Sequence, residues 1–382
     1  MEKVSDAPMI RSLLLLNKCA HYDVRTWKRF ETLGLPPEAF IEDSPSIWDE
    51  LDITERNKDV MSRALSFGWV DRELETCGRL GVRLVTFADA LFPPALLKIK
   101  NPPLLLYVKG NMPPAENKTI AVVGTRRCSV YGERTARAIG TRAAERGWNV
   151  ISGGAKGIDG AAHAGCLESG GITAALLGTG VDVVYPSEHA ELFSRILDRG
   201  ALCSEFSLGE KGESWHFPRR NRIIVGFASK IVIVEAPHKS GGMITAGLAA
   251  EEGREVWSVP GRIDDERCAG SNRLIFDGAM PLVDFELLFG SKSQYAETYI
   301  FTDEEMSGSQ PAGQVPAGPE RKNLTDGERK ILSLLAIHPD NTIDNLANEA
   351  KMGAAEVFNM ITVMSLRGLV FSSGPGRYSS CD

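Results

Sequence analysis

The chain has 382 residues, of which 43% are hydrophobic and 24% are charged, and its formal net charge is -7. This length accommodates two or three domains, each with a hydrophobic core. An acidic protein is not coated with basic surface, so a site for a nucleic acid would have to be a local basic groove. The composition therefore excludes a protein that binds polyanions over its whole surface.

The seven cysteines are scattered, and none belongs to a C-x-x-C pair. This usage is typical of free thiols in a reducing compartment and indicates no zinc site. The apolar run Leu13–Leu16 is too short for the hydrophobic part of a signal peptide, and no later run reaches membrane-spanning length. We therefore expect a cytoplasmic protein with no membrane contact and no bound metal.

Residues 1–70 carry apolar side chains at helical spacing, separated by turns such as Gly34-Leu35-Pro36. We expect them to form a small helical domain. Residues 71–117 follow as a connector that opens with a helix and continues with apolar runs bounded by prolines. Because proline disfavours helix at its own position and at the one before it, the runs Val82–Val85 and Leu104–Val108 are expected to be extended.

Residues 118–290 alternate short β-branched runs with helical segments bounded by glycines. This alternation predicts an α/β domain with a parallel sheet covered by helices on both faces. Such sheets bind ligands at the carboxyl ends of their strands. The predicted strands are Thr119–Val123, Trp148–Ser152, Ile172–Leu177, Ala201–Ser204, Ile231–Val234 and Glu255–Val259.

Residues 291–322 are poor in large apolar side chains, so we expect a flexible linker. Residues 323–382 predict three helices and a hairpin, the pattern of a winged-helix domain, with Thr325 and Thr342 as caps of the first two helices. The third helix, Ala354–Arg367, has no lysine or arginine before its end, which favours a protein contact or a structural role over the reading of duplex DNA. The predicted hairpin consists of Gly368–Phe371, the turn Gly374-Pro375-Gly376 and Arg377-Tyr378.

Three loops that follow predicted strands have the composition of anion sites. Each places backbone N–H groups and hydroxyls at the start of a helix, where negative charge is favoured. The alternative is that the glycines of each loop only permit a tight turn between strand and helix. The loops are Gly124–Gly132 with Arg126 and Arg127, Ser152–Asp159 with Lys156, and Ser240–Ala246.

A cationic cluster, Arg219-Arg220-Asn221-Arg222, directly follows the aromatic run Trp215-His216-Phe217. Guanidinium groups bind phosphate oxygens bidentately, and exposed rings stack on unpaired bases of any sequence. The alternative is that the rings belong to the core and the arginines to a solvated helix face. Because three anion-binding loops share the domain with this cluster, we favour a site for a nucleic-acid strand.

No loop has the spacing G-x-x-x-x-G-K-[ST] of a nucleotide phosphate loop or G-x-G-x-x-G of a dinucleotide site. ATP hydrolysis and NAD chemistry lose support, and we expect no cofactor. Asp159 and His163 are four residues apart, so one helix face could present an acid and a base, or two metal ligands. No third ligand or nucleophile accompanies them, which favours a capping aspartate, a packed histidine and no catalytic residue.

Seven segments of the chain, taken in sequence order, resemble the motifs of the DprA family of bacteria, also called DNA-processing protein A or Smf. The resemblance covers about Phe92 to Phe289. It implies an extended Rossmann-like domain, flanked by a sterile-alpha-motif-like domain and a winged-helix domain. It also implies a non-enzymatic homodimer that binds single-stranded DNA and loads the RecA recombinase during natural transformation and homologous recombination. The segments are Gly124-Thr125-Arg126, Ser152–Asp159, Gly178–Pro186, Phe217–Ile224, Ser240–Ala246, Val259-Pro260-Gly261 and Gly270–Ile275.

The resemblance also implies roles for individual residues, carried over by their positions in these motifs. Arg126 and Lys156 are expected to bind backbone phosphates, and Arg220, Asn221 and Arg222 to clamp the strand. One aromatic residue of the motif, Phe217, is the expected stacking ring. The expected DNA-binding residues are Gly124, Thr125, Arg126, Arg127, Lys156, Phe217, Arg219, Arg220, Asn221, Arg222, Ser240, Gly241 and Gly242.

Two positions depart from the pattern of the family. Thr125 stands where serine is commoner, which preserves the hydroxyl. The segment Ser207–Trp215 lacks the prolines that often precede the arginine motif, so the sequence leaves the shape of this loop open.

An enzymatic hypothesis remains as the alternative. The glycine turn Ser240–Thr245 also resembles that of nucleotide phosphoribohydrolases of the lysine-decarboxylase-like Rossmann group. Their motif carries a glutamate soon after the glycines, whereas here the first acids are Glu251 and Glu252, about two helical turns further on. The missing early glutamate disfavours this hypothesis.

Overall fold

The computed structural model describes residues 7–19, 22–114, 116–290, 324–338, 341–367, 369–374 and 377–380. The chain divides into two compact units, Met1–Ile300 and Phe301–Asp382. The predicted linker 291–322 lies outside the described residues, as do Gly368 and Pro375-Gly376 of the predicted hairpin. In the described part of the chain, no helix has both the length and the apolar composition needed to span a bilayer.

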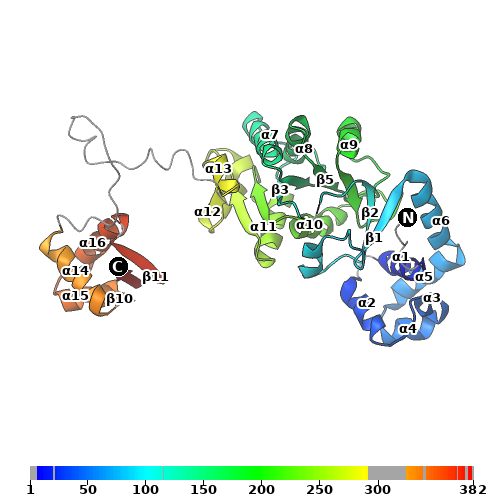
Figure 1. The fold of residues 1–382 in the computed structure, drawn as a ribbon, viewed down its shortest axis with the longest axis horizontal. Helices are drawn as coiled ribbons and strands as arrows, with labels where there is room; N and C mark the ends of the chain where they lie inside the picture. The colour runs from blue at the N-terminus through cyan, green and yellow to red at the C-terminus, as the bar shows by residue number, and fades with distance from the viewer. Residues whose placement is uncertain are drawn as a thin grey trace. The chain divides into compact units, whose positions relative to one another are not determined.

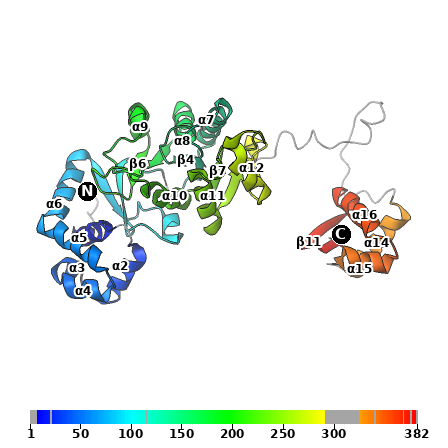
Figure 2. The same ribbon diagram turned by 180° about the vertical axis from the view of Figure 1, so that it is seen from behind.

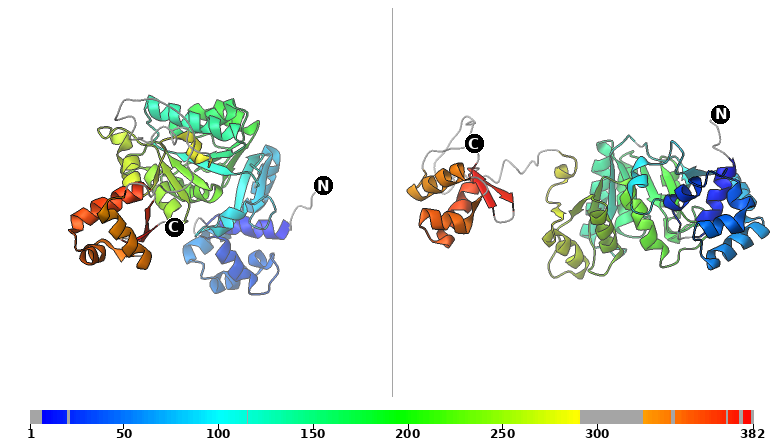
Figure 3. Two further views of the ribbon diagram at one scale, coloured as in Figure 1. Left: turned by 60° about the vertical axis from the view of Figure 1, so that its left-hand side comes forward. Right: turned by 90° about the horizontal axis from the view of Figure 1, so that it is seen from below.

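Six helices precede the sheet and share a hydrophobic core with it. Leu13–Leu16 are fully buried, and Trp27 and Phe40 belong to the same core as Leu105 and Tyr107 of the second strand. Figure 1 and Figure 3 show these helices, in blue, beside the edge of the sheet formed by its first two strands. The helices are α1 (Ala7–Asn17), α2 (Val24–Glu31), α3 (Ala39–Glu42), α4 (Ser44–Glu50), α5 (Glu55–Ser66) and α6 (Trp69–Leu80).

The described residues of the first unit form one nine-stranded sheet of order β1-β2-β6-β5-β4-β3-β7-β8-β9. All six predicted strands of the middle block are present, each within one residue at either end. The strands from β6 to β9 along this order are parallel to their neighbours, as predicted. The strands are β1 (Val82–Thr86), β2 (Leu105–Gly110), β3 (Thr119–Val123), β4 (Asn149–Ser152), β5 (Thr173–Leu176), β6 (Ala201–Ser204), β7 (Lys230–Ile233), β8 (Glu255–Ser258) and β9 (Met280–Pro281).

The connector is part of this sheet. Strand β1 pairs with β2, and β2 pairs with β6, both in the antiparallel direction. The two extended runs predicted from the prolines therefore add two antiparallel strands to one side of a mostly parallel sheet, with β1 as the outermost strand. The pairing of β2 with β6 joins residues almost a hundred positions apart, such as Tyr107 and Ser204, so no local pattern could predict it.

Helices cover both faces of the sheet, as Figure 1 and Figure 2 show, with α7, α8 and α9 on one face and α10 and α11 on the other. Side chains of β3 alternate between the two layers: Ile120 and Val122 pack with Ile139 of α7, whereas Ala121 and Val123 pack with Ile223 of α10. The remaining elements of this unit are α7 (Val130–Glu145), α8 (Ile158–Glu168), α9 (Ala190–Leu197), α10 (His216–Phe227), α11 (Gly241–Glu251), α12 (Ala269–Phe276), α13 (Phe285–Leu288), and the 3-10 helices η1 (Pro94–Lys98), η2 (Ser187–His189) and η3 (Glu266–Cys268).

The described residues of the second unit form three helices and a small antiparallel sheet of order β10-β12-β11. Thr325 and Glu328 form a reciprocal capping box at the start of its first helix, and Thr342 caps the second, as predicted. The strand that precedes the second helix was not predicted. The elements are α14 (Asp326–Ile337), β10 (Asn341–Thr342), α15 (Ile343–Ala350), α16 (Ala354–Leu366), β11 (Val370–Gly374) and β12 (Arg377–Ser380).

Candidate nucleic-acid interface

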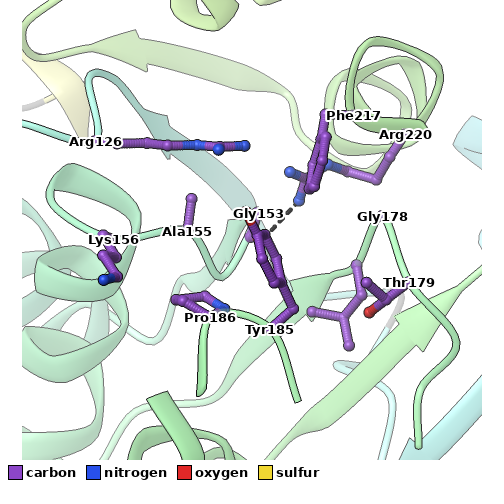
Figure 4. Close-up of a pocket in the computed structure, with 11 residues that line it drawn as sticks. Arg126, Gly153, Ala155, Lys156, Gly178, Thr179, Tyr185, Pro186, Phe217 and Arg220 are labelled. Carbon is purple, nitrogen blue, oxygen red and sulfur yellow. Dashed lines mark hydrogen bonds between the residues drawn. The ribbon is translucent and has the colours of Figure 1, made fainter. Parts of the chain in front are cut away.

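A pocket lies at the carboxyl ends of the neighbouring parallel strands β3, β4 and β5, where such sheets bind ligands (Figure 4). Its volume of about 60 Å³ has room for a small polar group such as a phosphate, since about 10–15 Å³ of such volume is enough to hold one water molecule. All charged residues that line it are cations, although the chain as a whole is acidic. The lining residues are Arg126, Gly153, Ala155, Lys156, Leu177, Gly178, Thr179, Tyr185, Pro186, Phe217 and Arg220.

Arg126 comes from the loop after β3, and its side chain is exposed. Its guanidinium carbon lies 4.8 Å from the centre of the Phe217 ring, which belongs to the first turn of α10. This cation–π contact orients the arginine over the pocket without using its hydrogen-bond donors. The donors therefore stay available for phosphate oxygens. The ring itself is half-buried and lies 5.7 Å from the ring of Tyr185.

Lys156 stands at the tip of the loop after β4 and is exposed. Its ammonium group forms an ion pair with Glu188. The hydrogen bond from Lys156 lowers the pKa of this carboxyl to about 2, so the acid stays ionised throughout the neutral range. An exposed pair of this kind contributes little to stability, so a phosphate can replace Glu188 at small cost.

Arg220 forms the floor of the pocket and is almost fully buried. It donates hydrogen bonds to the carbonyl oxygens of Gly153, at 2.6 Å, and Leu176. The pKa of Arg220 is lowered to about 10, mainly by burial and also by the charge of Arg126, whereas Asp159 opposes this shift. The guanidinium is therefore charged at neutral pH. Its Nε has no hydrogen-bond partner among the described residues.

Asp159 is the buried counter-charge of Arg220. Its carboxylate accepts hydrogen bonds from the backbone N–H groups of Gly153, at 3.1 Å, and Ala155, at 3.4 Å. Burial raises its pKa, and the charge of Arg220 limits the rise. A Cβ atom on Gly153 would lie 2.2 Å from the guanidinium nitrogen of Arg220 and 2.6 Å from the Asp159 carboxylate. Only glycine therefore fits between the two charges.

Arg219 and Arg222 do not line the pocket. Both pair with Glu205, which follows β6 and is 3% exposed: Arg219 Nε lies 2.9 Å from its carboxylate, and Arg222 donates to the same group. Burial raises the pKa of Glu205, but the two arginines lower it more, so that it lies below its usual range. Residues three apart lie on the same face of a helix, so Arg219 and Arg222 can both bind Glu205. Arg220 lies on another face and lines the pocket.

The other residues predicted in the first loop have structural contacts. The backbone N–H of Thr125 donates to the carbonyl oxygen of Glu235, at 2.7 Å, and its hydroxyl accepts from the backbone N–H of Arg127, at 3.2 Å. The side chain of Arg127 is exposed, next to the pocket in sequence but outside its lining. A Cβ atom on Gly124 would lie 2.7 Å from the same carbonyl oxygen of Glu235. The loop is thus anchored to the end of β7.

The glycine turn before α11 also lies outside the lining of the pocket. Ser240 caps α11 by accepting from the backbone N–H of Met243, at 3.4 Å. Asn221 is buried and donates to the carbonyl oxygen of Gly241, at 3.4 Å, which ties α10 to this turn. A Cβ atom on Gly242 would come within 3.7 Å of the Cα atom of Gly124. The turn therefore packs against the loop after β3.

Sequence reasoning missed Tyr185 and its neighbour Pro186 as lining residues. Tyr185 is 45% exposed and lies in the loop after β5, beside Phe217. The sequence contained a signal for this position. A tyrosine next to a proline, in a loop that follows a parallel strand, predicts an accessible ring at the edge of the sheet where ligands bind.

The pair Asp159 and His163 does not form an acid–base site. His163 is fully buried, its Nδ1 lies 2.7 Å from the Thr173 hydroxyl, and burial lowers its pKa to about 3. It packs inside the domain, as predicted. Asp159 binds the loop before its helix, whereas the N-cap position is Gly157. Across the described ranges of the chain, no three His, Cys, Asp or Glu side chains are placed to hold a metal ion.

Comparisons with known proteins agree with this fold and with the resemblance of the motifs. Residues 83–290 match the model of the family described as DNA recombination-mediator protein A. Protein Smf of Escherichia coli K12 is 33% identical over 296 residues, which are 77% of this chain and 76% of that protein. The DNA processing protein DprA of Streptococcus pneumoniae is 40% identical over 191 residues, 50% of this chain and 67% of that protein. The X-ray structure of DNA processing protein A from Streptococcus pneumoniae superposes with a TM-score of 0.58 and 31% identity, covering 64% of this chain and 85% of its own. The chain therefore belongs to the DNA recombination-mediator protein A family.

Proposed function

We propose that this protein binds single-stranded DNA at the pocket after β3, β4 and β5. The observation that carries the proposal is the convergence of Arg126, Lys156 and Arg220, from three separate segments, on one pocket with Phe217 on its rim. Arg126 and Lys156 would contact backbone phosphates, and Arg220 would supply charge from the floor. In this proposal Arg219 and Arg222 position α10 through Glu205 rather than touch DNA.

Selectivity for single strands follows from the rings. Phe217 and Tyr185 border the pocket and keep accessible surface. Base faces are free to stack on aromatic side chains only where the bases are unpaired, and such stacking tolerates any sequence. Binding should therefore be weakly dependent on sequence and strongly dependent on salt.

We further propose that the protein acts in recombination by passing the bound strand to RecA, as a cytoplasmic homodimer and without catalysis. The family description and the names of the relatives support this role. A DNA substrate and free thiols fit a cytoplasmic location. The helical block would be the sterile-alpha-motif-like domain, and α14–α16 with the three-stranded sheet the winged helix. Incubation with nucleoside monophosphates should release no free base, and measurable release would support the hydrolase hypothesis instead.

Arg126→Ala and Lys156→Ala should each weaken binding of an oligothymidine, because each removes one phosphate contact. Fluorescence anisotropy across a salt series should show the slope of log affinity against log salt flattening by about 0.7 for each variant. Arg134→Ala, an exposed arginine of α7 outside the pocket, is the matched control. Unchanged affinity and slope in both pocket variants would show that the strand binds elsewhere.

Glu188→Gln should tighten binding of the same oligothymidine by roughly two- to fivefold. The substitution removes the carboxylate that competes with phosphate for Lys156, and the gain is modest because exposed ion pairs are weak. Glu191→Gln, an exposed acid on the neighbouring helix, controls for the general loss of negative charge. Equal tightening by both variants would mean that the Lys156 pair has no specific effect.

A further inference from the structure

A second cavity of the first unit lies between the N-terminal helices and the start of α10. Its volume is about 500 Å³, within the range of about 300–1,000 Å³ that is typical of sites for organic ligands. Lys18 at the end of α1, Tyr22, Arg56 of α5 and Trp215 border it. We refer to this cavity as the α1–α5 groove.

Trp215 is the N-cap residue of α10 and remains 44% exposed. Its indole N–H donates to Glu213, at 2.6 Å, and its ring packs edge-on against His216, with centroids 4.1 Å apart. Phe206 contacts it from another side, at 6.0 Å between centroids. An exposed ring held in this way is already oriented for stacking, so a base that binds it costs little side-chain entropy.

A second ring of the groove is also fixed. The Tyr22 hydroxyl accepts from the Asn57 side-chain amide, at 3.0 Å, and from the backbone N–H of Thr54, at 3.3 Å. These bonds tie the segment after α1 to the start of α5. The groove therefore has two aromatic walls, on Tyr22 and Trp215, that come from elements far apart in the sequence.

The cations of the groove form no ion pair among the described residues. Lys18 lies over the Trp69 ring, 4.7 Å from its centre, and its charge also acts on the carboxyl of Glu73, but neither Lys18 nor Arg56 lies within ion-pair distance of a carboxylate in the described part of the chain. The acid that lines the groove, Asp52, is itself bound by Arg29 at 2.9 Å. Unpaired cations beside exposed rings complement a polyanion that carries free bases.

The groove and the pocket meet at one element. Trp215 and Phe217 stand two residues apart at the start of α10, one facing the groove and the other the pocket. We infer that the α1–α5 groove is a second binding segment for the same single-stranded DNA, in which a base stacks on Trp215 and the adjoining phosphates contact Lys18 and Arg56. This inference rests on the proposed function of the pocket and extends it to the N-terminal helices.

Oligothymidines of two lengths test the inference in the full chain, one of about 6 nucleotides, which spans the pocket alone, and one of about 16. Trp215→Ala should weaken binding of the long strand about tenfold, as expected for one lost stacking contact, and should leave the short strand unaffected. Trp215→Phe should retain most of the affinity. The double variant Lys18→Ala/Arg56→Ala should flatten the salt slope of the long strand alone, by about 1.4 for two phosphates.

Arg72→Ala, an exposed arginine of α6 outside the groove, is the matched control, and thermal midpoints show whether each variant is folded. Unchanged binding of the long strand in Trp215→Ala and in the double variant would overturn the inference while leaving the pocket intact. Equal losses with both lengths would place Trp215 in the pocket and would also overturn it. Failure of the parent protein to bind either strand would refute the proposed function itself.

Photocrosslinking of the parent protein gives a readout that needs no variant. A long oligonucleotide with a photoreactive base at successive positions should crosslink at one end of the strand to the peptide that contains Phe217. At the other end it should crosslink to peptides from α1 and α5. Crosslinks from every position that stay within the peptides of the pocket would overturn the inference.

Discussion

Glu205→Gln should lower the free energy of unfolding by about 3–5 kcal/mol, because it leaves the half-buried charges of Arg219 and Arg222 without a counter-ion. The carboxylate is 3% exposed and binds both arginines. Urea denaturation followed by circular dichroism measures the change. Glu145→Gln, an exposed acid of α7, should shift the midpoint little. A Glu205→Gln protein as stable as the parent would show that the two arginines do not depend on this acid.

The ion pairs of Glu205 with Arg219 and Arg222 also predict how the stability of the protein depends on pH. The pKa of Glu205 is lowered on folding, so its contribution to stability is present above its ordinary pKa, 4.5, and is lost as the pH falls through the lower pKa of the folded state. The difference in stability between the parent and Glu205→Gln should therefore be constant at neutral pH and shrink below about pH 4. A constant difference down to about pH 2 would contradict this origin of the stability.

Arg220→Ala should have a comparable effect on stability, about 3–5 kcal/mol, and should also abolish binding of single-stranded DNA. The substitution removes the two hydrogen bonds that join the ends of β4 and β5 and leaves Asp159 without its cation. Arg134→Ala, on the surface of α7, is the control. Removal of both charges, in Arg220→Met/Asp159→Asn, should recover part of the stability, because burying two neutral groups costs less free energy than burying one unpaired charge.

The loss of stability in Arg220→Ala should also depend on pH, through the carboxyl of Asp159. Without the guanidinium, the already raised pKa of Asp159 should rise further. A carboxyl whose pKa is raised on folding favours the folded state as the pH falls through that pKa, because protonation removes the buried charge. The deficit should therefore be smaller at about pH 5 than at about pH 8. A deficit that grows on acidification would rule out Asp159 as its source.

Replacing Arg219 and Arg222, and separately Arg126, should distinguish residues that bind DNA from residues that stabilise the fold. If Arg219 and Arg222 act only through Glu205, their replacement should change stability and leave the salt slope of binding unaltered in the folded protein. Arg126 should show the reverse, because its side chain is exposed and its cation–π contact with Phe217 lies at the rim of the pocket. The residues of the cationic cluster have different contacts: Arg219 and Arg222 bind Glu205, whereas Arg220 binds the carbonyl oxygen of Gly153.

The local sequence determined the strands of the middle block and the helix starts. Runs such as Thr119–Val123 and Ile231–Val234 are β-branched and bounded by turn residues, and a strand with this composition needs no distant partner to be recognised. Thr325 with Glu328 is likewise a signal contained within one helical turn. The glycine loops also placed Arg126 and Lys156 at the carboxyl edge, because parallel topology brings successive loops together.

Only the tertiary structure decided which arginines face the pocket. Arg219, Arg220 and Arg222 look alike in the sequence, but a helix turns by about 100° per residue, so they point in different directions. What each one meets depends on chain segments from other strands: Glu205 after β6 for two of them, and Gly153 for Arg220. Two further features depend on contacts between residues far apart in the chain. They are the antiparallel pairing of β2 with β6 and the core that the N-terminal helices share with the sheet. Local periodicity carries no information about such partners.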